Sequence, residues 1–293
     1  MQVTRAAAVD ALRELAPLEL AAEWDNVGLL LNPGASVEEA RAAPARKLFL
    51  TIDLTEAVLD EAIEWNAELI VAYHPVIFKP LSRLDGSERS QRLVLRALAH
   101  GIAVYSPHTA LDAVPGGIND WLASALGPAS EVRPIEACRP SVQPEQVASK
   151  AQPGTQAGLG RWVTLQHPIS VAQLLRNIAA HLGLRNLRVA LSAEHASDAK
   201  SVQEIALCPG AGGSLLKAAP GADVYWTGEM RHHDVLDLRE RGASVILSEH
   251  TLTERGYLPE LAQHLRSRLP SSDIWISERD ADPLAIVSGS NEF

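Results

Sequence analysis

The chain has 293 residues and a formal net charge of −10 at pH 7, with 46% hydrophobic and 21% charged residues. This is the composition of a soluble globular protein with one large or two medium domains. The negative charge argues against broad, nonspecific binding to nucleic-acid phosphates, although a local basic patch is compatible with it. The two cysteines, Cys138 and Cys208, argue against a disulfide scaffold and suit a reducing compartment.

The first twenty residues, MQVTRAAAVDALRELAPLEL, predict an amphipathic helix, because apolar residues recur at helical spacing with Asp10, Arg13 and Glu14 between them. The stretch lacks the long apolar core of a signal peptide. No part of the chain reaches the roughly 18 consecutive apolar residues that a membrane-spanning helix needs. We therefore expect a cytoplasmic protein without a membrane partner.

Apolar runs of strand length alternate with amphipathic segments along most of the chain. The amphipathic segments carry apolar residues three and four positions apart and often begin at Thr, Ser or Asp, which is typical of helices. Strands are predicted at residues 47–52, 68–73, 102–106, 162–166, 187–191, 204–208, 222–226, 244–248 and 273–277. This alternation predicts an α/β fold with mixed or mainly parallel sheets.

One stretch, residues 128–158, breaks the alternation. It is rich in Pro, Ser, Gln and Ala, which is typical of a linker or a mobile loop. We therefore expect two α/β subdomains. The first consists of residues 1–127 together with about 243–293, and the second is an insertion that covers residues 159–242.

Polar residues gather directly after five of the predicted strands. In open α/β sheets, ligands bind just beyond the carboxyl ends of the strands, so this is where functional side chains are expected. The residues concerned are His74 after 68–73, His108 and Asp112 after 102–106, Gly210, Gly212 and Gly213 after 204–208, Glu229 and His232 after 222–226, and His250 and Glu254 after 244–248.

Four of these residues form a mixed nitrogen and oxygen ligand set for a divalent metal: His74, Asp112, His250 and Glu254. His250 and Glu254 are four residues apart, so on a helix their side chains face the same way, as two ligands of one metal do. Zinc, manganese, iron and nickel all suit such a set, and spacing does not choose among them. Because these ligands come from both ends of the chain, the C-terminal segment is expected to return to the first subdomain.

The remaining polar residues leave alternatives open. His108 and Asp112 can also be a pair that stabilises a turn. The glycine loop at Gly210, Gly212 and Gly213 is either a tight turn or a nest of N–H groups that holds an anion at a helix start. His232 and His233 point about 100° apart on a helix, so we expect His232 to face a substrate or to support the metal ligands rather than to bind the metal.

Six motifs occur in a fixed order: EWDNVGLLL, YHPVIF, SPHTALDAVPGG, CPGAGGSLL, ADVYWTGEMRHHDVL and SEHTLTERG. Together they resemble the GTP cyclohydrolase type 2 homologue family, also called the NIF-three-like family. The resemblance covers nearly the whole chain, with residues 128–158 as the main exception. The Tyr-His-Pro sequence at Tyr73 and the SPHTALDAVPGG motif are closer to the eukaryotic-type members.

The resemblance implies two α/β subdomains with a dinuclear metal site in the cleft between them. It implies His74, Asp112, His250 and Glu254 as ligands, with Glu254 bridging two ions, and hexameric rings in bacterial members. Bacterial members usually carry His-His-Pro where this chain has Tyr73, so a ligand of the second ion is missing and one or two ions are expected. A phenolate at Tyr73, or a His108 that swings in, is an alternative second-site ligand.

Two functional hypotheses follow. In the first, the protein is a metal-dependent hydrolase of a nucleotide or another phosphorylated small molecule, because a bound metal makes hydroxide available near neutral pH. Glu254 and His108 are its candidate catalytic residues, the glycine loop holds phosphate, and His232 or Glu229 can move protons. In the second, the protein is a non-catalytic scaffold or regulator that acts through protein partners, as the resemblance to eukaryotic members implies. Under either hypothesis, we expect the protein to be a homo-oligomer.

Overall fold

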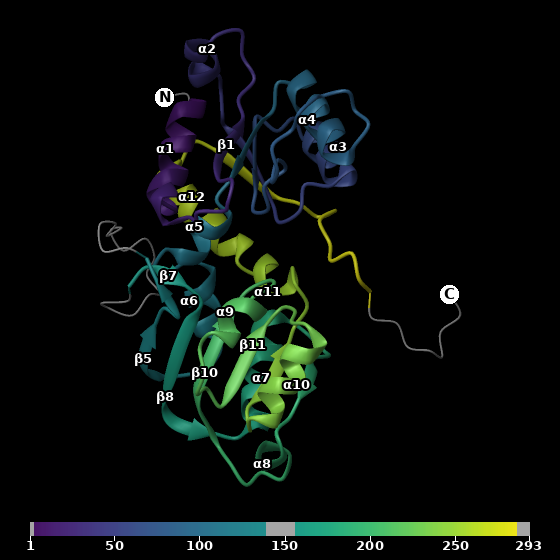
Figure 1. Ribbon diagram of the computed structural model, residues 1–293. Helices are drawn as coiled ribbons and strands as arrows, with labels where there is room; N and C mark the ends of the chain where they lie inside the picture. The colour runs from purple at the N-terminus through teal and green to yellow at the C-terminus, as the bar shows by residue number, and fades with distance from the viewer. Residues whose placement is uncertain (1–2, 139–155, 286–293) are drawn as a thin grey trace.

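The computed structural model describes residues 3–138 and 156–285, which form two β-sheets with helices packed around them (Figure 1). Most of the predicted linker lies outside the described residues. No helix in the described part of the chain is long and apolar enough to cross a membrane. The two sheets are stacked along the long direction of the molecule in Figure 1, and the segment containing α11 and α12 passes from one to the other.

The first sheet has five strands in the order β1-β4-β3-β2-β13. β13, β2, β3 and β4 are parallel neighbours, and β1 pairs antiparallel with β4 at one edge. Its strands are β1 (Gly28–Leu31), β2 (Lys47–Thr51), β3 (Leu69–Ala72), β4 (Ala103–Ser106) and β13 (Asp273–Ile276). The central strands are continuous apolar runs because helices cover both faces of this sheet.

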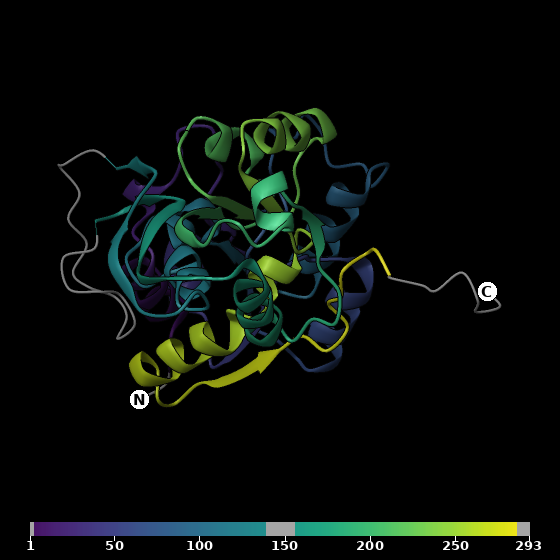
Figure 2. The same cartoon turned by 90° about the horizontal axis from the view of Figure 1, so that it is seen from below.

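Alternate residues of these strands point to different helices. Phe49, Ile70 and Val104 belong to the core beneath one pair of helices, α3 (Glu56–Glu64) and α4 (Arg89–Ala99). The residues that alternate with these along each strand point to the other face of the sheet. That face is covered by α1 (Arg5–Leu15) and α12 (Leu258–Arg268). The short helix α2 (Val37–Ala42) lies beside α1, and Figure 2 shows α12 running next to β13.

The second sheet has six strands in the order β5-β8-β10-β11-β12-β9. β10, β11 and β12 are parallel, and the other pairs are antiparallel. Its strands are β5 (Ala129–Arg133), β8 (Arg161–Ile169), β9 (Arg188–Ala190), β10 (Val202–Cys208), β11 (Val224–Thr227) and β12 (Ser244–Leu247). The short strands β6 (Glu136–Ala137) and β7 (Gly158–Leu159) form a separate pair.

Helices also cover both faces of the second sheet. One face carries α7 (Val171–Leu182) and α6 (Ile118–Ala123), and the other carries α9 (Gly213–Lys217) and α10 (His232–Glu240). The remaining short helices are η1 (Leu18–Leu20), α5 (His108–Ala113), α8 (Ala193–Ala196) and α11 (Leu252–Arg255).

One hydrophobic cluster joins the two sheets. It contains Leu50 and Val71 of the first sheet together with Trp226 and Ile246 of the second. A buried ion pair fastens α6 to the second sheet, because Nε of Arg161 on β8 lies 2.6 Å from Oδ1 of Asp120 on α6. Side chains at the junction of the sheets are therefore held by a continuous packed core.

The predicted α/β fold is confirmed, and each of the predicted strands is present. Strand β12 lies in the second sheet, although we expected residues from about 243 onward in the first unit. It belongs there because its fully buried residues continue the parallel run of β10 and β11. Strand β5 occupies the start of the expected linker; its mostly exposed residues at the sheet edge carry no strand pattern.

The C-terminal segment does return to the first sheet, since β13 pairs with β2. The subdomain boundaries themselves stay a prediction.

One buried carboxylate in α3 fastens the end of β13 and the residues that follow it. Glu61 accepts hydrogen bonds from Nε1 of Trp275 at 3.0 Å, Oγ of Ser277 at 2.6 Å, and the backbone N–H groups of Glu278 at 2.9 Å and Arg279 at 3.0 Å. Burial by itself raises the pKa of Glu61, but these hydrogen bonds outweigh it and hold the pKa below its ordinary value.

We predict that Glu61→Gln lowers the free energy of unfolding at pH 7 by about 1–3 kcal/mol, because an amide cannot accept all of these bonds. A carboxyl with a depressed folded-state pKa stabilises the protein above its unfolded pKa of about 4.3, and that stabilisation is lost as the pH falls through the folded-state pKa. The difference between variant and wild type should therefore shrink below about pH 4. Urea unfolding at several pH values measures both effects.

Glu64→Gln is the matched control, since Glu64 lies on the same helix and its exposed side chain pairs with Arg279 at the surface. It should change the stability much less. Equal losses in the two variants would contradict a special contribution from Glu61.

Candidate metal centre

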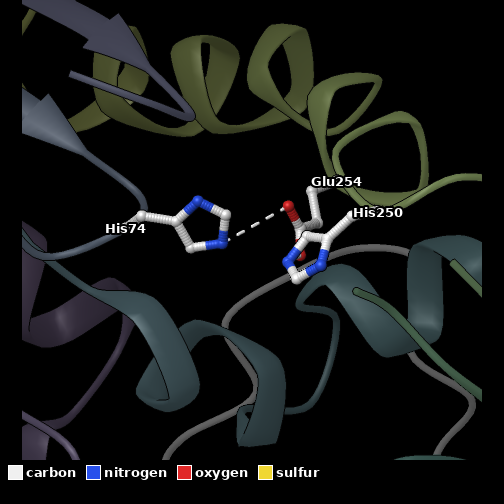
Figure 3. Close-up of side chains that lie close together, drawn as sticks. All are labelled: His74, His250 and Glu254. Atoms are coloured by element: carbon white, nitrogen blue, oxygen red, sulfur yellow. Dashed lines mark ion pairs between the residues drawn. The ribbon is translucent and has the colours of Figure 1, made fainter. Parts of the chain in front are cut away.

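Three side chains from distant parts of the chain meet where the two sheets join (Figure 3). His74 follows β3 of the first sheet, and His250 follows β12 of the second. Glu254 lies on α11, one turn after His250, and its carboxylate sits between the two imidazoles. Nε2 of His74 is 3.6 Å from Oε2 of Glu254, and Nε2 of His250 is 3.4 Å from Oε1. One potential ligand atom from each residue lies within 4.8 Å of the others, so this group can hold a metal ion.

A carboxylate fixes the outer nitrogen of each imidazole. Nδ1 of His74 lies 3.0 Å from Oδ1 of Asp53. Asp53 is two residues beyond the end of β2, the strand next to β3. Nδ1 of His250 lies 2.8 Å from Oε1 of Glu229, which follows β11. A carboxylate on Nδ1 orients the ring and leaves Nε2 for a metal, as in many histidine metal sites. Both rings therefore direct Nε2 toward Glu254.

Glu254 is the most deeply buried member of the group, with 3% of its side chain exposed. Its Oε2 atom is buried and has no hydrogen-bond donor. A buried carboxylate oxygen without a donor is costly unless a cation lies against it. Burial by itself lowers the pKa of His74, but the carboxylates of Asp53 and Glu254 outweigh it and raise that pKa to about 10. The site thus favours a cation between the rings: without a metal this is the proton on the His74 ring, which an ion bound at Nε2 would displace.

Gly210 provides space for this group. A Cβ at this position would lie 2.6 Å from Oε1 of Glu254 and 2.9 Å from Nε2 of His250. Its backbone φ of +57° is also one that glycine adopts readily. The N–H of Gly210 donates to Oγ1 of Thr253 at 2.8 Å, and the N–H of Gly212 donates to Oγ1 of Thr227 at 3.0 Å. These two N–H groups are engaged within the protein, so a phosphate nest at the loop would have to break both bonds.

Asp112 lies close to the group but is bound to another side chain. The Tyr73 hydroxyl donates to Oδ1 of Asp112 at 2.7 Å, and both residues are buried. Burial raises the pKa of Asp112 to about 6, and the nearby Glu254 carboxylate adds to this increase. Burial and Asp112 also raise the pKa of Tyr73, so Tyr73 is a neutral donor to Asp112 rather than a phenolate.

His108 stands beside the group at the start of α5. Its ring centroid is 5.5 Å from that of His74, and its Nδ1 lies 2.7 Å from Oδ1 of Asp25. The backbone φ of His108 is +29°, a conformation that is uncommon for a residue with a side chain and that often marks a functional position. His108 thus lies next to the candidate metal ligands.

The other predicted residues lie farther out. His232 is exposed at the start of α10, with its ring 5.4 Å from that of His233. Gly213 begins α9 and packs near Met230. Sequence reasoning did not select Asp53, although it follows a predicted strand in the same way as the residues that were selected. Asp25 lies in the EWDNVGLLL motif, but its contact with His108 joins positions 83 residues apart and has no local sequence signal.

A family model described as Duf34/NIF3 (NGG1p interacting factor 3) matches residues 3–283. The chain belongs to the Duf34/NIF3 family. NIF3-like protein 1 of Drosophila melanogaster is 40% identical over 284 residues, which cover 97% of this chain and 89% of the relative. The NGG1-interacting factor 3 of Saccharomyces cerevisiae is 36% identical over 268 residues, which cover 90% of each. The resemblance to the family and to its eukaryotic members is confirmed.

Solved structures share the Duf34/NIF3 fold. A Bacillus cereus protein related to NIF3 aligns with a TM-score of 0.79 and 20% identity, covering 98% of this chain and 100% of that one. The reduced HcgD protein of Methanocaldococcus jannaschii aligns with a TM-score of 0.74 and 22% identity, covering 95% and 99%. At these identities, the likeness concerns the fold alone.

The space at Gly210 yields a prediction for metal affinity. Gly210→Ala should weaken zinc or manganese binding at least about tenfold, because its Cβ would displace ligand atoms. Gly183→Ala is the control, since Gly183 has a similar φ of +67° but no atom within 4 Å of an added Cβ. Backbone strain should cost each variant about 1–2 kcal/mol of stability, and the contact of the new Cβ with Glu254 and His250 should add to the loss in Gly210→Ala. Titration against a chelator measures the affinity, and equal affinities in the two variants would refute the spatial argument.

The contact between Asp53 and His74 yields a second prediction. Asp53→Asn should raise the dissociation constant of the bound ion about 10–100-fold, because Nδ1 of His74 loses its anionic partner. Asp60→Asn removes a half-exposed carboxylate of α3 that pairs with Arg96 and should leave the affinity unchanged. The same chelator competition decides the outcome: wild-type affinity in Asp53→Asn would exclude a supporting function for Asp53.

Proposed function

We propose that this protein binds a divalent metal ion through His74, His250 and Glu254 and hydrolyses a phosphorylated small molecule, such as a nucleotide. The observation that carries the proposal is the buried Oε2 atom of Glu254, which lacks a hydrogen-bond donor and faces an imidazole whose outer nitrogen is already held. Asp112 is the proposed additional ligand, adjacent to the group. The mixed nitrogen and oxygen donors suit zinc, manganese, iron or nickel.

The bound ion would supply Lewis acidity and a water of lowered pKa. The chain's own residues position the reaction. Asp53 and Glu229 orient the two imidazoles, and Glu254 holds a negative charge at the centre. His108 has Nδ1 against the Asp25 carboxylate, which leaves Nε2 as the atom that transfers a proton to or from a bound molecule. The glycine loop does not hold the phosphate in this proposal, because the N–H groups of Gly210 and Gly212 already donate to Thr253 and Thr227.

A second candidate function is regulation through a protein partner. The name of the yeast relative, NGG1-interacting factor 3, states an interaction with another protein. The bond from Tyr73 to Asp112 also occupies a carboxylate that a hydrolase would use at its metal. In this case the ion would stabilise the junction of the sheets without turnover. The homo-oligomer, including a hexamer, and the cytoplasmic location stay predictions for either function.

The central experiment compares wild type with Glu254→Gln. We expect the purified wild-type protein to contain about one divalent ion per chain and the variant to lose most of it, because an amide provides no charge at the centre. Elemental analysis measures the metal, and a screen of nucleotides and phosphoesters measures turnover. Glu56→Gln, which removes a carboxylate that pairs with Arg96 on the first sheet's helices, is the control.

The outcomes separate the hypotheses. Full metal content in Glu254→Gln would contradict the assigned ligands. Bound metal without turnover of any compound would favour the regulator, and turnover that survives in Glu254→Gln would move catalysis to a different site.

A further inference from the structure

Two large aromatic side chains stand exposed beside the metal centre. Trp24 is 64% exposed and Phe78 is 47% exposed, and their ring centroids are 6.1 Å apart in an edge-on arrangement. Trp24 precedes Asp25 in the EWDNVGLLL motif, and Phe78 ends the YHPVIF motif that contains His74. The function proposed above assigns nothing to either aromatic residue.

The segments that carry these rings are fastened to each other and to the site. Nδ2 of Asn26 donates to the backbone oxygen of Ile77 at 2.5 Å, which ties the residue after Asp25 to the residue before Phe78. Asp25 accepts from the N–H of Thr109 at 3.1 Å and also from the Thr109 hydroxyl. Both aromatic residues therefore project from segments that hydrogen bonds hold in place.

A continuous series of ring contacts leads from this pair to the metal centre. The His108 ring lies 6.1 Å from Trp24 and 6.4 Å from Phe78, measured between centroids. The next centroid, that of His74, is 5.5 Å from His108. His108 therefore lies between the aromatic pair and His74, so Trp24 and Phe78 are two ring contacts away from the candidate metal ligands.

We propose that Trp24 and Phe78 form a binding subsite for a planar aromatic ring of a small molecule whose oxygen-bearing end lies at the metal centre. The proposal deepens the proposed metal site and rests on it for the position of the polar end. Aromatic faces bind planar rings by offset or edge-on contacts at these separations. The charged residues Glu23 and Lys79 flank the two aromatic residues in sequence, which suits one ring better than an extended protein interface.

The experiment compares phenyl phosphate with methyl phosphate, which share the phosphate and differ in the ring. Isothermal titration calorimetry measures both affinities in zinc-loaded and in EDTA-treated protein. We expect wild type to bind phenyl phosphate at least about fivefold more tightly, and Trp24→Ala and Phe78→Ala to abolish this ratio. Trp24→Phe should retain most of it. Trp275→Ala, which removes a partly exposed tryptophan on β13, should leave it unchanged.

Comparing the zinc-loaded protein with the EDTA-treated protein distinguishes the contribution of the ring subsite from that of the metal centre. A loss of affinity on EDTA treatment that is equal for both phosphates reports the metal centre, whereas the ratio between the phosphates reports the ring subsite. Equal affinities in wild type, an unchanged ratio in both alanine variants, or no binding of either phosphate would overturn the subsite. None of the aromatic variants should change the metal content.

Discussion

The buried carboxylate of Glu254 is the constraint on which the rest of the site depends. A carboxylate removed from water costs several kcal/mol unless cations and donors compensate it. Here two imidazoles approach it, and each imidazole is held by a further carboxylate, Asp53 or Glu229. The resulting cluster has three carboxylates and two imidazoles, and the buried Oε2 atom of Glu254 still has no hydrogen-bond donor.

The fold meets this requirement by joining the ends of two sheets. His74 and Asp53 come from neighbouring parallel strands of one sheet, and Glu229 and His250 from neighbouring parallel strands of the other. The chain then passes directly from α11, which carries Glu254, to α12 on the first sheet. Buried Asp280 accepts from the N–H of Ile52 at 2.7 Å and pairs with Arg255, so the C-terminal segment also supports the site.

Membership in the Duf34/NIF3 family means that relatives share this fold. The two eukaryotic relatives compared share 36–40% identity over most of the chain, whereas the two solved structures share the fold at 20–22% identity. The geometry adds detail that the family name does not contain. The Tyr73 hydroxyl is hydrogen-bonded to Asp112. Three consecutive residues of one motif have different contacts: Trp24 is exposed to solvent, Asp25 contacts His108, and Asn26 donates to the segment that carries Phe78.

The fold class, most of the strands and three residues of the candidate site could be predicted from the sequence alone. Strand and helix periodicity is local, so the α/β class and strands such as β2 and β10 followed from it, and the polar residues after the strands indicated His74, His250 and Glu254. Only the tertiary structure decided that β12 joins the second sheet, that β5 forms, and that Tyr73 binds Asp112 while Asp25 binds His108. The edge strand β5 is mostly exposed and lacks a hydrophobic pattern, and contacts between positions 39 or 83 residues apart depend on how the sheets pack, which no local pattern encodes.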